Sequence, residues 1–143
     1  METIWQTRWA NHIREVRIAA CDADHDLKAR GVAERVRYAV QLVIEELMTN
    51  SIKYAFHDDE EHAIGLTMAV EDETVRITLT DDGDPFDPSC DPQNGLCRPI
   101  PKPSQGGMGI MMVRTICDSI TYQRENGRNV VQVDIAARPE RSE

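Results

Sequence analysis

The chain has 143 residues, of which 41% are hydrophobic, and its formal net charge is −9 at pH 7. This length predicts a single domain over residues 1–137, able to bury a core without disulfides or a structural metal, followed by a tail over 138–143. The hydrophobic content excludes a disordered chain, and no apolar run is long enough for a membrane helix. The acidic charge argues against nucleic acid as a partner, because binding to phosphates needs a basic face.

The first third of the chain predicts a strand and two helices. Residues 3–9 alternate weakly between apolar and polar side chains, which is typical of an edge strand. A helical pattern follows over about 11–28, and Gly31 is a typical stop for it. A longer helix is predicted over about 33–56.

Alternation of apolar and polar residues predicts four further strands, over 64–70, 74–80, 119–124 and 129–136. The first two are joined by an acidic turn, and the last two by a turn that contains Asn126-Gly127, a strong hairpin signal. Between the hairpins lie a loop over about 81–105, which holds most of the prolines, and a helix over about 108–117. Short turns predict a mixed or antiparallel sheet with helices on one face, that is, a two-layer α+β sandwich.

A first cluster of polar residues lies on the long predicted helix, where Glu46, Asn50 and Lys53 recur at i, i+4 and i+7. At about 100° per residue they share one arc beside the apolar face, where a helix can form the wall of a pocket. A carboxylate can take a proton, an amide oxygen can bind Mg²⁺ and an ammonium can contact a phosphate. For this segment alone, a solvated polar flank is the simpler interpretation.

A second cluster, Asp81-Asp82-Gly83-Asp84, follows the strand over 74–80. Acidic residues beside Gly and Pro are typical of a turn. In a binding interpretation, one carboxylate accepts a hydrogen bond from an exocyclic amine, while Gly83 lets a ring approach the backbone. Crowded carboxylates also suggest Ca²⁺, but their spacing does not follow the EF-hand pattern.

A third cluster, Gly106, Gly107 and Gly109, opens the predicted helix over 108–117. Glycines at a helix start leave backbone N–H groups open to an anion, which predicts a phosphate site. A flexible hinge explains the same residues equally well. The pattern is neither G-x-G-x-x-G nor a Walker A loop.

The four cysteines contain no C-x-x-C pair, and we interpret all of them as reduced thiols. Cys90 and Cys97 share the long loop and could pair or hold a metal, but no histidine lies near them in the sequence. The amino-terminal residues lack the basic start and apolar stretch of a signal peptide, so we expect the protein in the cytoplasm.

In their order and spacing, these clusters resemble the motifs of the GHKL nucleotide-binding superfamily, which has the histidine kinase-like ATPase fold. The matching segments are Glu46-x-x-x-Asn50 with Lys53 for the N box, Asp81-x-Gly83 for the first glycine box and Gly107-x-Gly109 for the second. Within the superfamily, the chain is similar to the bacterial anti-sigma regulatory factors that are serine/threonine protein kinases. It is too short to include a gyrase-type transducer domain, and its histidines lack the helical context of a phosphoacceptor.

This resemblance implies that ATP and Mg²⁺ bind to the chain, and it implies roles for single residues. Asn50 would hold Mg²⁺, and Glu46 would act as general base toward a Ser or Thr hydroxyl of a protein substrate. Asp81 would accept a hydrogen bond from the adenine amine, and Gly83 would let the base approach. The other nucleotide-binding positions are Lys53, near a phosphate, and the glycines of the lid over the phosphates, Gly106, Gly107 and Gly109.

The resemblance also implies partners: a sigma factor, a small antagonist protein that the kinase phosphorylates, and a second copy of the chain. Some kinases of this group carry Arg before the second glycine box, where this chain has Gln105. Gln cannot neutralise developing charge, so Arg98, Lys102 or Arg114 would have to substitute, or transfer would be slow. Two alternatives stay open: a nucleotide-binding partner-switching module without kinase activity, and the ATPase subdomain of a split histidine kinase.

Overall fold

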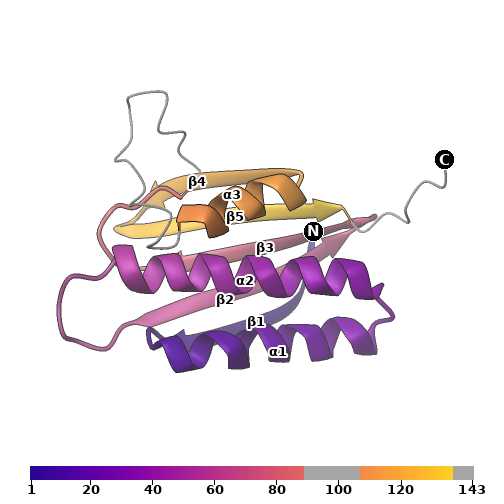
Figure 1. Cartoon of the computed structure of the whole chain (residues 1–143), viewed down its shortest axis with the longest axis horizontal. Coiled ribbons are helices and arrows are strands. Elements are labelled where there is room, and N and C mark those ends of the chain that lie inside the picture. Colours follow the sequence, from indigo (N-terminus) through magenta and orange to yellow (C-terminus); the bar gives the residue numbers. More distant parts are fainter. Residues whose placement is uncertain (89–106, 137–143) are drawn as a thin grey trace.

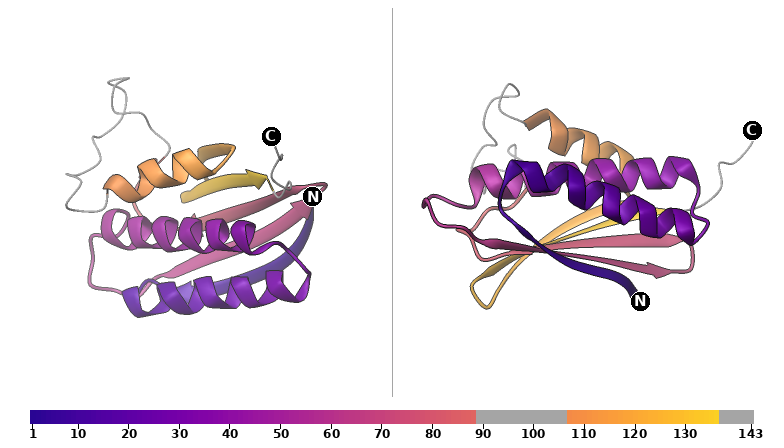
Figure 2. Two further views of the ribbon diagram at one scale, coloured as in Figure 1. Left: turned by 45° about the vertical axis from the view of Figure 1, so that its right-hand side comes forward. Right: turned by 90° about the horizontal axis from the view of Figure 1, so that it is seen from below.

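The computed structural model describes residues 1–88 and 107–136. Five strands form one sheet in the order β1-β2-β3-β5-β4, and the three helices lie on one of its faces (Figures 1 and 2). The elements are β1 (Glu2–Ala10), α1 (Ile13–Ala29), α2 (Glu34–Tyr54), β2 (Ala63–Glu71), β3 (Thr74–Asp81), α3 (Gly107–Ile116), β4 (Ser119–Glu125) and β5 (Arg128–Ala136). The predicted two-layer α+β sandwich is therefore confirmed.

All neighbouring strands in the sheet pair antiparallel, so the sheet is antiparallel rather than mixed. β1 forms one edge, as predicted, and β4 forms the other. β5 pairs with β3 on one side and with β4 on the other, so the last of the described strands lies inside the sheet.

The turns have the backbone geometry that their residues favour. Asn126 and Gly127 both have positive φ values, 51° and 74°, which the tightest hairpin turn requires and which Asn-Gly adopts readily. Gly31 lies two residues after the end of α1 with φ of 77°, in the left-handed region where glycine avoids a steric penalty. The predicted hairpin turn and helix stop are both confirmed.

The core lies between the helices and the sheet, and α2 supplies its largest helical share. The apolar face of α2 is fully covered, and its buried members are Val36, Val40, Val43, Ile44, Leu47 and Met48. Alternate residues of β2, β3 and β5 meet this face, as the period of a half-buried strand requires. The two ends of α2 are thereby fixed against the sheet, and its polar flank has a defined position.

Within the described ranges, no helix is long and apolar enough to cross a membrane. Cys90, Cys97 and Gln105 of the predicted long loop lie outside these ranges, and so do Gly106, before the predicted helix over 108–117, and the predicted tail over 138–143.

Candidate functional site

The helix that carries the first predicted cluster meets the second cluster where the C-terminal end of α2 passes the end of β3. Ser51 Oγ of α2 donates a hydrogen bond of 2.8 Å to Asp81 Oδ2 of β3. One turn further along the chain, the Ala55 carbonyl accepts a hydrogen bond of 2.7 Å from the Asp84 backbone N–H. The helix end and the acidic segment are therefore joined by hydrogen bonds in a polar region next to the core.

Asn50 directly precedes Ser51 on α2 and is only 2% exposed. Its Nδ2 donates a hydrogen bond of 2.7 Å to the Glu46 carbonyl one turn earlier, which fixes the plane of the amide. Among the described residues, none donates a hydrogen bond to Asn50 Oδ1. Every fully buried side-chain oxygen in this part of the chain has a hydrogen-bond partner. The Asn50 Oδ1 carbonyl oxygen has the chemistry of a ligand for a hard cation.

Glu46 stands one turn before Asn50 and is half-buried, whereas Lys53 is exposed. Burial of the Glu46 carboxyl raises its pKa, the neighbouring Glu45 carboxylate raises it further, and the Lys53 ammonium lowers it. A raised pKa makes this carboxylate a stronger base, as proton abstraction from a hydroxyl requires.

Asp81 is 4% exposed and is held by hydrogen bonds from three segments of the chain. Its Oδ1 accepts from the Gly83 backbone N–H at 2.9 Å and from Asn129 Nδ2 at 2.8 Å, and its Oδ2 accepts from Ser51. A carboxylate can accept about four hydrogen bonds, so this one retains capacity for a ligand donor. Its orientation is fixed before any ligand arrives.

Gly83 packs directly on the end of α2. A Cβ atom at this position would lie 2.5 Å from the Ala55 carbonyl oxygen and 2.7 Å from the Ala55 Cβ. Glycine is therefore required here by the contact between two backbone segments. The sequence did not indicate this packing requirement at Gly83. It applies in addition to the predicted approach of a ring.

Asn129 is a residue of the candidate site that sequence reasoning missed. It is 1% exposed, and its Nδ2 also donates to the Asp84 carbonyl at 2.8 Å. Its Oδ1 accepts from the Tyr122 hydroxyl at 2.6 Å and from Arg124 Nη1 at 3.1 Å. One signal could have found it, because Asn129 is the polar member of an alternate series that continues with buried Val131, Val133 and Ile135.

Only part of the third cluster lies within the described residues. Gly107 begins α3 and Gly109 lies in its first turn, while Gly106 lies outside the described residues. α3 packs beside α2. Arg114, near the end of α3, donates a hydrogen bond of 3.3 Å from Nη2 to the Pro88 carbonyl, whereas Arg98 and Lys102 fall outside the described ranges.

Comparison with known proteins identifies the family. Residues 9–135 match the family described as the histidine kinase-like ATPase domain. The serine/threonine-protein kinase BtrW of Bordetella bronchiseptica is 27% identical over 106 residues, which cover 74% of this chain and 75% of that protein. The serine-protein kinase RsbW of Bacillus subtilis is 25% identical over 114 residues, which cover 73% of this chain and 71% of that protein.

A crystal structure of the RsbU and RsbW domains of a Mycobacterium tuberculosis protein has the same fold. It matches with a TM-score of 0.64 and 12% identity, over 93% of this chain and 32% of that longer chain. The polar region at the ends of α2 and β3 is thus part of a fold that a solved structure also has. Because the family match covers most of its length, the chain belongs to the histidine kinase-like ATPase domain family.

Proposed function

We propose that this chain, as one domain over residues 1–137, is an ATP-dependent serine/threonine protein kinase of the anti-sigma type that acts in the cytoplasm. It would phosphorylate a small antagonist protein and bind a sigma factor. The observation that carries the proposal is the buried Asn50 amide, whose nitrogen is fixed by Glu46 and whose oxygen has no donor among the described residues. Kinase names among the relatives support the proposed activity.

The proposed adenine contact uses the carboxylate of Asp81. Its three hydrogen bonds from Ser51, Gly83 and Asn129 hold it rigid and leave it one acceptor position for the exocyclic amine of adenine. A contact that is already oriented loses little entropy when the ligand binds. Under this proposal, Gly83 borders the ring and the end of α2 together.

Asn50 Oδ1 would hold Mg²⁺ together with phosphate oxygens and waters. When bound, the ion would neutralise negative charge on the phosphates. Lys53, exposed one turn further along α2, would lie near a phosphate. The glycines that would form the lid over the phosphates are Gly106, Gly107 and Gly109.

Glu46 would accept the proton of the Ser or Thr hydroxyl while the hydroxyl oxygen attacks the γ-phosphorus of ATP and ADP leaves. The burial that raises the Glu46 pKa supports this role. Gln105 and the bond between Arg114 and the Pro88 carbonyl favour a second candidate, a partner-switching module that binds nucleotide without transferring phosphate. In either case the nucleotide site is the same.

Titration calorimetry with ADP, with and without Mg²⁺, tests the site. Asn50→Ala should abolish the Mg²⁺-dependent part of binding, whereas Gln41→Ala, which removes a half-buried amide elsewhere on α2, should leave it intact. Equal affinity in the Asn50 and Gln41 variants would remove the main argument.

Transfer is tested separately with labelled ATP and an antagonist-like protein encoded beside this chain. Acid-stable label on Ser or Thr supports the kinase, and acid-labile label indicates phosphohistidine. Nucleotide binding without any labelled product would favour the partner-switching module.

A further inference from the structure

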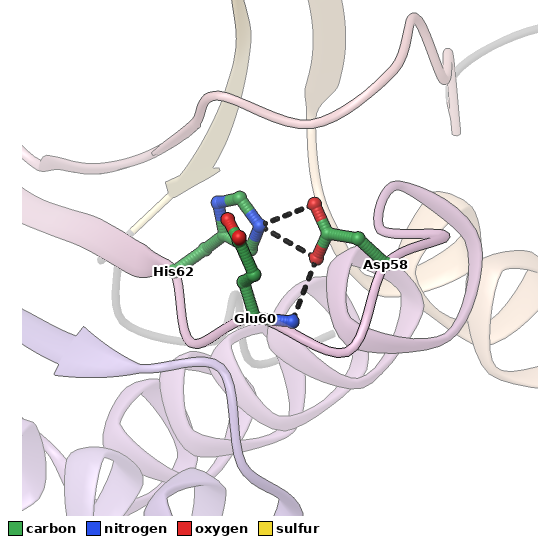
Figure 3. A group of neighbouring side chains, drawn as sticks. All are labelled: Asp58, Glu60 and His62. Carbon is green, nitrogen blue, oxygen red and sulfur yellow. Dashed lines mark hydrogen bonds and ion pairs between the residues drawn. The ribbon is translucent and has the colours of Figure 1, made fainter.

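The connection between α2 and β2 contains six consecutive residues that can all bind metal ions, His57-Asp58-Asp59-Glu60-Glu61-His62. One donor atom each from Asp58, Glu60 and His62 lie within 4.8 Å of one another (Figure 3). Asp58 and Glu60 are exposed and His62 is half-buried, so the cluster is accessible from solvent. We propose that this cluster binds a divalent transition metal ion of the Zn²⁺ class.

The two ring nitrogens of His62 face two different elements. Nε2 lies 2.8 Å and 2.9 Å from the two oxygens of Asp58, and Nδ1 lies 3.2 Å from Asp82 Oδ1, which follows β3. A histidine that binds a metal almost always donates its other ring N–H to a carboxylate or carbonyl, which fixes its tautomer. Asp82 is placed to accept that N–H while Nε2 faces the donor cluster.

The ring of His62 is also fixed in its plane. It stacks on Phe56 with the ring centroids 4.6 Å apart and an interplanar angle of 22°. The Glu60 backbone N–H donates to Asp58 Oδ1 at 3.1 Å, so the turn holds its own carboxylate in position. The three donors therefore come from a short segment whose shape is set before a metal arrives.

Charge around the cluster favours a cation. No Lys or Arg within the described ranges forms an ion pair with Asp58, Glu60 or Asp82, and the ion pairs of Asp58 and Asp82 are both with His62. A nitrogen donor beside carboxylates selects Zn²⁺, Co²⁺ or Ni²⁺ over Mg²⁺ and Ca²⁺, which prefer oxygen ligands. The site is thus chemically distinct from the proposed Mg²⁺ position at Asn50 and shares no residue with it.

The location links the site to the acidic segment. Asp82 lies between Asp81 and Gly83, so a metal on His62 would tie the α2–β2 connection to the strand end that forms the candidate nucleotide site. His57 Nε2 of the same connection lies 3.6 Å from Asp84 Oδ2 on the other side of Gly83. The proposal itself stands without nucleotide binding, because none of its donors depends on a nucleotide.

Long-range proton–nitrogen NMR of the imidazole rings tests the site residue by residue. The full chain, in millimolar Mg²⁺ and without nucleotide, is titrated with Zn²⁺, and the spectra are assigned with single His→Gln variants. Nε2 of His62 should change from a protonated to a metal-bound resonance, while exposed His25 on α1 stays unchanged. Because each imidazole ring gives its own resonance, Zn²⁺ binding to the cysteines does not contribute to the change expected for His62.

Matched variants separate a built site from general attraction to acidic residues. Asp82→Asn should weaken Zn²⁺ binding roughly 10- to 100-fold, and Asp58→Asn at least as much. Asp59→Asn, an exposed neighbour outside the donor set, should change it less than twofold. An unchanged His62 ring in excess Zn²⁺, or equal losses in the Asp58 and Asp59 variants, would overturn the proposal.

Discussion

Substitution of Gly83 by Ala should destabilise the fold because of its contact with the end of α2. The added Cβ would lie 2.5 Å from the Ala55 carbonyl oxygen, where ordinary contact begins at 3.4 Å, so the two segments must separate by about 0.9 Å. The opposing atoms are backbone and Cβ atoms, which cannot rotate away. Overpacking of this kind costs about 1–3 kcal/mol.

The same separation strains the hydrogen bond of 2.7 Å between the Asp84 N–H and the Ala55 carbonyl. A hydrogen bond contributes about 1 kcal/mol, so the total loss in the free energy of unfolding is about 2–4 kcal/mol. For a domain of this size, 1 kcal/mol shifts Tm by about 4 °C, which predicts a fall of about 8–16 °C.

Thermal and urea denaturation followed by circular dichroism measure this effect. Gly65→Ala is the matched control, because its Cβ would meet its nearest atom, the Thr80 carbonyl oxygen, at 3.8 Å. Its Tm should stay within a few degrees of the wild type. If Gly83→Ala unfolds with the Tm of the wild type but loses ADP affinity, Gly83 serves the ligand and the packing argument is refuted.

Further predictions concern the carboxylates and their partners. Glu46→Gln should leave ADP affinity nearly intact and slow phosphoryl transfer. In the wild type, the rate of transfer should fall as pH drops through the raised pKa of Glu46, and the variant should lose this fall at acid pH. Equal turnover in both proteins would show that Glu46 is not the base. Asn129→Ala should cost about 1–3 kcal/mol in urea denaturation, because Asp81 loses a buried donor, and an unchanged midpoint would contradict this network. The pKa of His62 is raised, so the stability that the His62 charge contributes is complete below the unfolded pKa of His62 and is lost as pH rises through the folded pKa. The pKa of Asp58 is lowered, so the stability that the Asp58 charge contributes is lost as pH falls through the folded pKa of Asp58. Denaturation of His62→Gln across this range should show a flatter pH profile than the wild type, and identical profiles would exclude the pair as the cause.

Local signals in the sequence were sufficient for most elements. Asn126-Gly127 predicts its hairpin because few other pairs adopt two successive positive φ values, and the apolar period of α2 predicts which side faces the sheet. The sequence also places Asn50 on the flank of that face. Helix ends differ from prediction by only a few residues, where capping and fraying decide the bounds.

The contacts across the site could not be predicted from local patterns. Asp81 meets Asn129 because β5 pairs with β3 in the register that places these residues opposite each other. That register joins segments almost fifty residues apart, and nothing near either residue specifies it. The tight approach of Gly83 to Ala55 likewise depends on how a helix end and a strand end are packed.

The place of β5 inside the sheet has a consequence for biosynthesis. β5 is the last strand of the described residues, and its Asn129 donates a hydrogen bond to the Asp81 carboxylate. During translation β3 is therefore an open sheet edge until residues 128–136 have left the ribosome, and open edges are prone to pair with other chains. A chain truncated before β5 should aggregate and should lack the proposed nucleotide site, because the Asp81 carboxylate then has no Asn129 donor.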